Sequence, residues 1–140
     1  MKHITLIFAL IFLFFGNNFA QTIEGKWKAY ENGKPSSIIL IYQDKDGTYS
    51  GKMVEILNKN LVNKICNNCK DERKNQPFKG LVILKYLKPN EDKTSAENGK
   101  ILDPANGKEY NCKIRVDGNE LRMKAYWGFL YGSRTWYKTE

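Results

Sequence analysis

Two cysteines three positions apart, Cys66 and Cys69, are the residues whose type and spacing point most directly to chemistry. Such a pair forms a disulfide that staples a loop, works as a redox-active dithiol, or supplies half of a zinc site. The surrounding sequence does not suggest the thioredoxin-like fold that normally carries a redox dithiol at a helix N-terminus. A zinc site would need further ligands, and only Cys112 and carboxylates remain to supply them.

The N-terminal residues 1–20 are typical of a secretory signal peptide. Lys2 precedes an uninterrupted apolar run over residues 4–15, and Ala20 provides a small residue at the expected cleavage site. A retained anchor is the weaker interpretation, because a membrane-spanning helix needs about 20 apolar residues. We therefore expect an exported protein, periplasmic or secreted, consisting of residues 21–140. In an oxidising compartment a disulfide is the simplest state of the Cys-x-x-Cys pair.

Cleavage would also remove His3, the one histidine of the sequence. The mature chain would then lack imidazole as a general base, as a partner of a nucleophile and as a zinc ligand. Enzymatic chemistry would have to use other groups, such as a pair of carboxylates for glycoside hydrolysis drawn from Glu55, Glu97, Asp103 and Glu109. An enzyme is therefore the last-ranked class, and neither a metal nor a cofactor is expected.

Positive charge is spread along the whole chain. The sequence has 23 Lys and Arg against 15 Asp and Glu, which gives a formal net charge of +8. The basic residues stand one or two at a time, as is typical of solvated strand faces. The alternative is an anionic partner such as an acidic polysaccharide or lipid headgroups. Nucleic acid is not an expected partner, because none of the recognised nucleic-acid-binding motifs occurs.

Short runs of alternating polarity predict β-strands along most of the mature chain. The clearest pair is residues 108–116 and 120–127, which are joined by an Asp-Gly turn. Residues 58–79 and 88–98 break the pattern and are expected to form loops. The remaining strand candidates are residues 25–30, 36–43, 49–57, 81–87, 100–102 and a short strand that ends at residue 137.

Eight short strand candidates without a convincing long helix predict an all-β fold. We expect a single antiparallel up-and-down β-barrel rather than a sandwich, because the connections read as hairpins. Asn32-Gly33 is a strong hairpin signal. Asp103 is followed by proline and opens a turn in which Gly107 accepts a positive φ. Cys112 falls in the apolar phase of its strand and is expected to be a buried free thiol.

Aromatic residues in these strands have two interpretations. They line a cavity for a small apolar or amphipathic ligand, or they fill the core of a small barrel. The run from Tyr126 to Tyr131 is exceptional, because so many large apolar groups at a strand end cannot all point inward. It is the best candidate for a barrel mouth or a partner-binding patch. The candidate lining residues are Trp27, Tyr126, Trp127, Phe129 and Trp136.

Several segments together resemble an uncharacterised bacterial family, domain of unknown function 2147, whose members are small exported β-barrels. The resemblance rests on residues 99–110, 121–128 and 132–136, together with Gly25-x-Trp27, Tyr49-Ser-Gly-Lys52 and the Cys-x-x-Cys pair. In one departure, Lys124-Ala125 stands where the family usually has Arg-Gly. The family name implies no activity.

A second resemblance concerns how the barrel closes. Gly25-x-Trp27 near the N-terminus, with Arg134 on the last strand, is similar to the closure of lipocalin-like (calycin) barrels. In that arrangement the arginine lies over the face of the tryptophan. The resemblance implies a cation–π contact between Trp27 and Arg134 that joins the first and last strands.

Three function classes remain, in order of preference. The first is an exported barrel that binds a small apolar or amphipathic ligand without covalent chemistry. The second is a cell-envelope module, in which a filled barrel carries the patch at residues 126–131 and the cysteine loop to a protein or polysaccharide. The third is an enzyme or a redox protein that uses Cys66 and Cys69.

Overall fold

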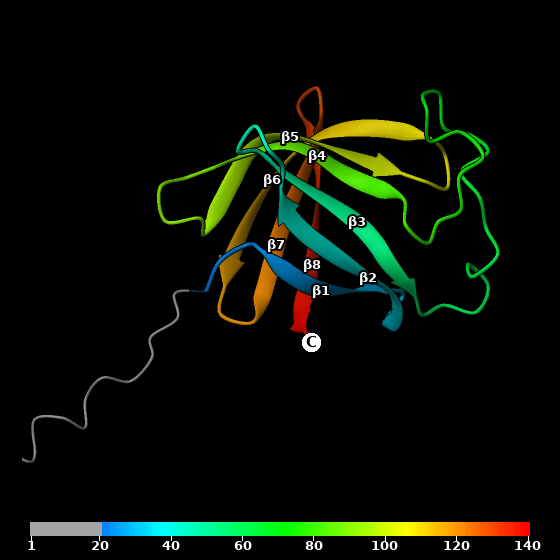
Figure 1. Ribbon diagram of the computed structural model, residues 1–140, viewed down its shortest axis with the longest axis horizontal. Coiled ribbons are helices and arrows are strands. Elements are labelled where there is room, and N and C mark those ends of the chain that lie inside the picture. Colours follow the sequence, from blue (N-terminus) through cyan, green and yellow to red (C-terminus); the bar gives the residue numbers. More distant parts are fainter. Residues whose placement is uncertain (1–20) are drawn as a thin grey trace, which may run out of the picture.

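Each alternating run of the sequence forms a strand in the computed structural model, which describes residues 21–140. Every strand pairs antiparallel with the next along the chain, and the last pairs with the first, so the sheet closes into the expected up-and-down barrel (Figure 1). The predicted signal peptide, residues 1–20, lies outside the described residues. The strands are β1 (Gly25–Glu31), β2 (Lys34–Gln43), β3 (Tyr49–Ile56), β4 (Val82–Pro89), β5 (Ser95–Asp103), β6 (Lys108–Asp117), β7 (Glu120–Trp127) and β8 (Leu130–Thr139). None of the described residues belongs to a helix of the length and apolarity needed to cross a bilayer.

The β4–β5 connection differs most from the sequence prediction. β5 begins at Ser95, not at residue 100, because a tight turn replaces the expected long loop. The Asn90 side chain holds this turn by accepting hydrogen bonds from the backbone N–H groups of Thr94 and Ser95, at 3.0 and 3.1 Å. A register shift between Ala96 and Gly99 then interrupts the two-residue period. The two-residue period is the signal that predicts strands, so the sequence pattern does not indicate that residues 95–99 belong to a strand.

The barrel interior is packed on the side of β2 to β6. Gly51 and Gly99 face inward, and neither has room for a methyl group. A Cβ at Gly51 would lie 2.9 Å from Leu84 Cδ1, and one at Gly99 would overlap Leu87. Cys112 is buried against this region, and burial raises the pKa of its thiol to about 12, so it is inert. Among the described buried side chains, the Tyr49 hydroxyl alone has no hydrogen-bond partner.

The two ends of the barrel are unequal. Successive strands run in opposite directions, so the connections alternate between the ends. One end carries the β2–β3, β4–β5 and β6–β7 turns and both ends of the described chain, and it is plugged by apolar residues. Ile23 and Trp27 are fully buried there, and the Trp27 indole N–H donates to the Ile23 carbonyl at 2.9 Å. The other end carries the loop at residues 57–81 and the β7–β8 turn.

The cation over the Trp27 ring is Lys138, and the contact expected from Arg134 is absent. Lys138 is the register partner of Trp27, and its ammonium lies 4.7 Å from the ring centroid while donating to the Glu24 carbonyl at 3.1 Å. Arg134 instead stands opposite Met123, four residues earlier on β8. Four residues span about 13 Å along a strand, which puts the guanidinium out of reach. Gly25, with φ of 125°, leaves room for the Lys138 ammonium.

The closure contact is testable by a double-mutant cycle. Trp27→Leu and Lys138→Met should couple by about 0.5 to 1 kcal/mol in the free energy of unfolding, because each removes one half of the cation–π contact. Denaturant unfolding of the two single variants and the double variant measures this coupling. Trp27→Leu with Arg134→Met is the matched control and should be additive. Coupling to Arg134 but not to Lys138 would contradict the structure.

Candidate functional site

A clamped loop, residues 57–81, is the longest irregular segment of the described chain. Cys66 and Cys69 form a disulfide inside it, with Cα atoms 5.4 Å apart and both residues buried. The loop docks on the β5–β6 turn, where Asn68 donates its side-chain amide to the Ala105 carbonyl at 3.1 Å. Buried sulfur atoms have little access to a partner thiol, so the pair is built as a staple rather than as an exchange centre.

The β5–β6 turn is shaped to receive this loop. The Asp103 carboxylate accepts from the Ala105 N–H at 2.9 Å, and the Gly107 N–H donates to the Asp103 carbonyl at 2.8 Å. Gly107 has φ of 74°, and a Cβ at this position would overlap the carbonyl group of Asn68. Any side chain at Gly107 would therefore both strain the turn and displace the disulfide loop.

A buried arginine fixes the same loop to the barrel wall. Arg73 is 5% exposed and uses its whole guanidinium. Its Nε and Nη2 atoms donate to the Asp71 carboxylate at 2.6–3.1 Å, Nη2 also donates to Glu109 on β6 at 2.9 Å, and Nη1 donates to the Val82 carbonyl at 2.9 Å. These hydrogen bonds hold the pKa of Asp71 down at about 2. Every nitrogen of the Arg73 guanidinium is engaged, so the cluster serves as a clamp.

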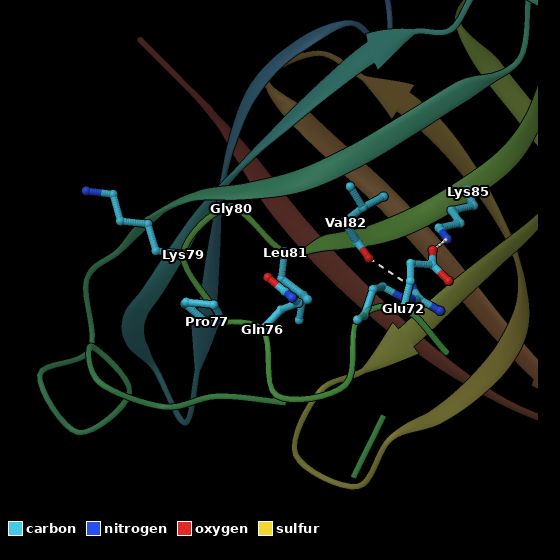
Figure 2. A pocket seen from close by; sticks show the side chains of 9 residues that line it. Glu72, Gln76, Pro77, Lys79, Gly80, Leu81, Val82 and Lys85 are labelled. Atoms are coloured by element: carbon cyan, nitrogen blue, oxygen red, sulfur yellow. Dashed lines mark hydrogen bonds and ion pairs between the residues drawn. The ribbon is translucent and has the colours of Figure 1, made fainter. Parts of the chain in front are cut away.

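A hollow of about 300 Å³ separates the clamped loop from the start of β4 (Figure 2). Gln76, Pro77 and Leu81 line its loop side, and Glu72 points across it toward Lys85 (Figure 2). The Lys85 ammonium lies 2.9 Å from the Glu72 carboxylate, so these two charges neutralise each other. Among the lining residues Lys79 is left without an ion pair, so the hollow offers an incoming ligand a single uncompensated charge.

The candidate carboxylates of the sequence do not form a pair. Glu109 is held by Arg73, and Asp103 is engaged in its own turn. Glu97 stands in register with Lys88 on β4, and Glu55 stands opposite Ile38 on β2. Among residues 21–140, no group of three or more His, Cys, Asp or Glu side chains is placed to hold a metal ion.

The open end of the barrel at β7 and β8 is the best candidate for a binding site. Four register pairs share the inner face of these strands: Leu121–Trp136, Met123–Arg134, Ala125–Gly132 and Trp127–Leu130. The first pair is buried in the plugged end, whereas Trp127 and Leu130 are 69% and 63% exposed. The inner face therefore runs from core to solvent without losing its apolar character, and it carries one cation, Arg134.

Strand pairing explains why this part of the inner face is accessible. β8 is ten residues long, but its ladder with β1 spans only three residue pairs, between residues 26–28 and 137–139. β1 ends at Glu31, and the β1–β2 ladder shifts register between Ala29 and Tyr30. The half of β8 from Leu130 to Thr135 consequently pairs with β7 alone.

The five aromatic residues predicted to line a ligand site occupy different places. Trp27 and Trp136 are core residues of the plugged end. Tyr126 lies on the outer face opposite Tyr131, with ring centroids 6.5 Å apart, and Phe129 is 96% exposed in the β7–β8 turn. Trp127 alone lies on the inner face at the open end. Met123, Leu130 and Arg134 also lie on this inner face, and the sequence analysis did not include them among the lining residues.

A signal for these missed residues was present in the sequence. Counting the two-residue period back from Trp136 along the last strand places Leu130 and Arg134 in phase with Trp136 on the inner face. The clamp was harder to find. Its one signal is that Arg73 stands in a loop otherwise rich in lysine, and arginine is the residue that makes several fixed hydrogen bonds when buried.

Comparison with known proteins identifies the family. Residues 25–138 match the family described as "Uncharacterized protein conserved in bacteria (DUF2147)". The chain belongs to this family. No curated protein matches the chain. A solved structure titled "Protein HP1028 from the human pathogen Helicobacter pylori belongs to the lipocalin family" is similar, with 20% sequence identity, a TM-score of 0.70, and coverage of 84% of this chain and 82% of that one. At this identity the likeness shows that the DUF2147 barrel shares the lipocalin fold.

The clamp predicts a specific acid sensitivity. The folded-state pKa of Asp71 lies below its usual value of 3.8, so its stabilisation is complete above pH 3.8 and is lost as pH falls through about 2. Because the carboxylate is partly exposed, we expect about 1 to 2 kcal/mol. Denaturant unfolding of the wild type and of Asp71→Asn at pH 5 and near pH 2 measures it. The variant should lose less stability on acidification, and an equal loss in both proteins would refute the clamp.

The disulfide predicts a moderate effect of reduction. Closing so short a loop should stabilise the fold by about 2 kcal/mol on a chain-entropy basis, so reduction should lower the free energy of unfolding by about that amount. Denaturant unfolding with and without a phosphine reductant is the measurement. Circular dichroism should still show the barrel after reduction. If reduction instead leaves stability unchanged and the pair exchanges rapidly with glutathione, the redox interpretation is correct.

Proposed function

We propose that this DUF2147 protein is an exported carrier or sensor that binds one small amphipathic anion at the open end of its barrel. The apolar part of the molecule lies against Trp127, Leu130 and Met123, and its anionic group meets Arg134. The observation that carries the proposal is the continuous inner face of β7 and β8, which stays apolar as it emerges into solvent and holds a cation.

The charge of Arg134 supports an anionic group on the ligand. Within residues 21–140, the ion pairs of arginine involve Arg73 and Arg122, and none involves Arg134. An exposed guanidinium beside an apolar surface binds a carboxylate, sulfate or phosphate through charge-assisted hydrogen bonds. The lipocalin fold supports a single small ligand, because eight-stranded barrels of this kind hold one small molecule at most.

The packed interior supports a shallow position for the proposed ligand. Gly51 and Gly99 have no space for a methyl group, so the β2–β6 side of the barrel does not admit a ligand without movement of Leu84 or Leu87. The proposed ligand therefore lies at the mouth, between β7, β8 and the open side next to β1. This is shallower than the cavity expected from the sequence.

Binding of dodecanoate tests the proposal, with dodecanol as the uncharged probe. Isothermal titration should show saturable one-to-one binding of dodecanoate below its micellar concentration. Arg134→Gln should weaken dodecanoate binding by about tenfold or more, because a charge-assisted hydrogen bond is lost, and should leave dodecanol binding unchanged. Leu130→Ser should weaken both probes.

Lys45→Gln, which removes a cation from the β2–β3 turn at the plugged end, is the control and should have no effect. No saturable binding of either probe would reject the proposal and favour the second function class, an envelope module with a filled barrel. The packing around Gly51 and Gly99 is the observation that favours that second class.

A further inference from the structure

The β7–β8 hairpin ends in an exposed apolar tip, residues Trp127 to Tyr131. Figure 1 shows this hairpin projecting beyond the body of the barrel at the top of the view. Phe129 is 96% exposed at its end, and Trp127, Leu130 and Tyr131 are each about two thirds exposed. Gly128, with φ of 61°, supplies the tight turn that keeps these side chains together. No other part of the described chain gathers this many exposed large apolar residues.

Lysine side chains surround the aromatic rings of the hairpin. The ammonium of Lys108 lies 5.8 Å from the Trp127 ring centroid, and that of Lys124 lies 5.3 Å from the Tyr131 centroid. Lys113 similarly lies 5.8 Å from the ring of Tyr126. The apolar tip therefore has a cationic rim, which comes from β6 and β7.

The outer face of β6 and β7 continues this positive charge. Lys113 stands directly opposite Lys124, and Arg115 stands directly opposite Arg122. Like charges opposite each other destabilise a sheet, and of these four cations only Arg122 forms ion pairs, at 3.2 and 3.4 Å. The four cations border a hollow of about 510 Å³ whose lining also includes Arg134, the hydroxyl residues Ser95, Ser133 and Thr135, and one carboxylate, Glu97. Five cations against one carboxylate leave an excess of positive charge that an anionic partner would offset.

An anionic bilayer fits both features better than another macromolecule does. Cores of protein–protein interfaces are depleted of lysine, whereas this tip is ringed by it. A soluble polyanion would use the cations but would leave Phe129 in water. Interfacial membrane binding combines aromatic and aliphatic side chains that enter the acyl boundary with lysines at the headgroups. Lys124 lies three residues from Trp127, about 10 Å along the strand, which matches the depth of such insertion.

We propose that the hairpin tip docks this protein on the surface of a bilayer that contains anionic phospholipids. Phe129, Trp127 and Leu130 enter the interface between headgroups and acyl chains. Lys108, Lys113 and Lys124 contact the lipid phosphates. This inference does not rest on the proposed ligand site, because Phe129 lies in the turn, outside the inner face that would hold the ligand.

Co-sedimentation with vesicles tests the proposal. A protein of residues 21–140 should bind vesicles of phosphatidylcholine and phosphatidylglycerol in equal parts. It should bind pure phosphatidylcholine vesicles at least tenfold more weakly. Phe129→Ser should reduce binding to the mixed vesicles about tenfold or more, since an almost fully exposed side chain would lose its burial in lipid. Lys124→Gln should reduce it about fivefold.

Two matched control variants test whether vesicle binding depends on the hairpin tip or on any exposed apolar or lysine side chain. Val62→Ser removes an exposed apolar side chain from the clamped loop, and Lys45→Gln removes a lysine from the β2–β3 turn at the plugged end. Neither should change vesicle binding. Of the three tryptophans, Trp127 alone is exposed, so brominated lipids should quench its fluorescence selectively.

Several outcomes would overturn the proposal. Equal binding to both vesicle types, or no effect of Phe129→Ser, would show that the tip does not insert. Capture by dextran sulfate that depends on Lys124 but not on Phe129 would assign the surface to a soluble polyanion. A dimer that Phe129→Ser abolishes, without vesicle binding, would make the tip a contact between copies. Phe129→Ser should weaken vesicle binding and spare dodecanoate binding, so the failure of one idea can be told from the failure of the other.

Discussion

The barrel depends on a short closure between its first and last strands. β1 and β8 share only three residue pairs, and Trp27 stands at the middle pair, opposite Lys138. Its ring fills the plugged end, its indole N–H satisfies the Ile23 carbonyl, and its face receives the Lys138 ammonium. A ladder this short would hold the sheet weakly by backbone hydrogen bonds alone, so burial of one large side chain carries much of the closure.

The same short closure creates the open end. Because the β1–β8 ladder stops at Lys28, the half of β8 from Leu130 to Thr135 is left with β7 as its one neighbour, and the hairpin extends beyond the barrel wall. An edge of this kind is normally blunted by charge or covered by chain. Here the apolar inner face and the tip remain exposed, ringed by lysine, while the rest of the wall is packed. Scaffold and binding surface are thus separated along the barrel axis.

Rigidity elsewhere supports this division. Arg73 ties the longest loop to β4 and β6, the disulfide closes a turn within this loop, and Asn68, between the two cysteines, bonds to the β5–β6 turn. These contacts restrain the loop at residues 57–81. They lie at the same end of the barrel as the open mouth. A carrier that loads from a bilayer would need the mouth and the docking surface side by side, and the hairpin tip adjoins the inner face that holds Arg134.

The sequence by itself determined most of the fold. Two-residue periodicity and the Asn-Gly and Asp-Gly turns located six strands closely, since half-buried strands and tight turns leave local signals. The last strand was expected to be short, but β8 runs for ten residues. β5 was truncated because a bulge breaks the period near Gly99. The disulfide spacing and the buried state of Cys112 were also readable locally.

Tertiary structure alone decided the contacts between distant residues. Register between β1 and β8 selected Lys138 rather than Arg134 for Trp27, and no local pattern records the register of strands more than a hundred residues apart. The Arg73–Glu109 ion pair and the separation of Trp127 from Trp27 and Trp136 arise in the same way. The composition shows that the chain is rich in aromatic and basic residues. The short β1–β8 ladder decides which of them are exposed at the same end of the barrel.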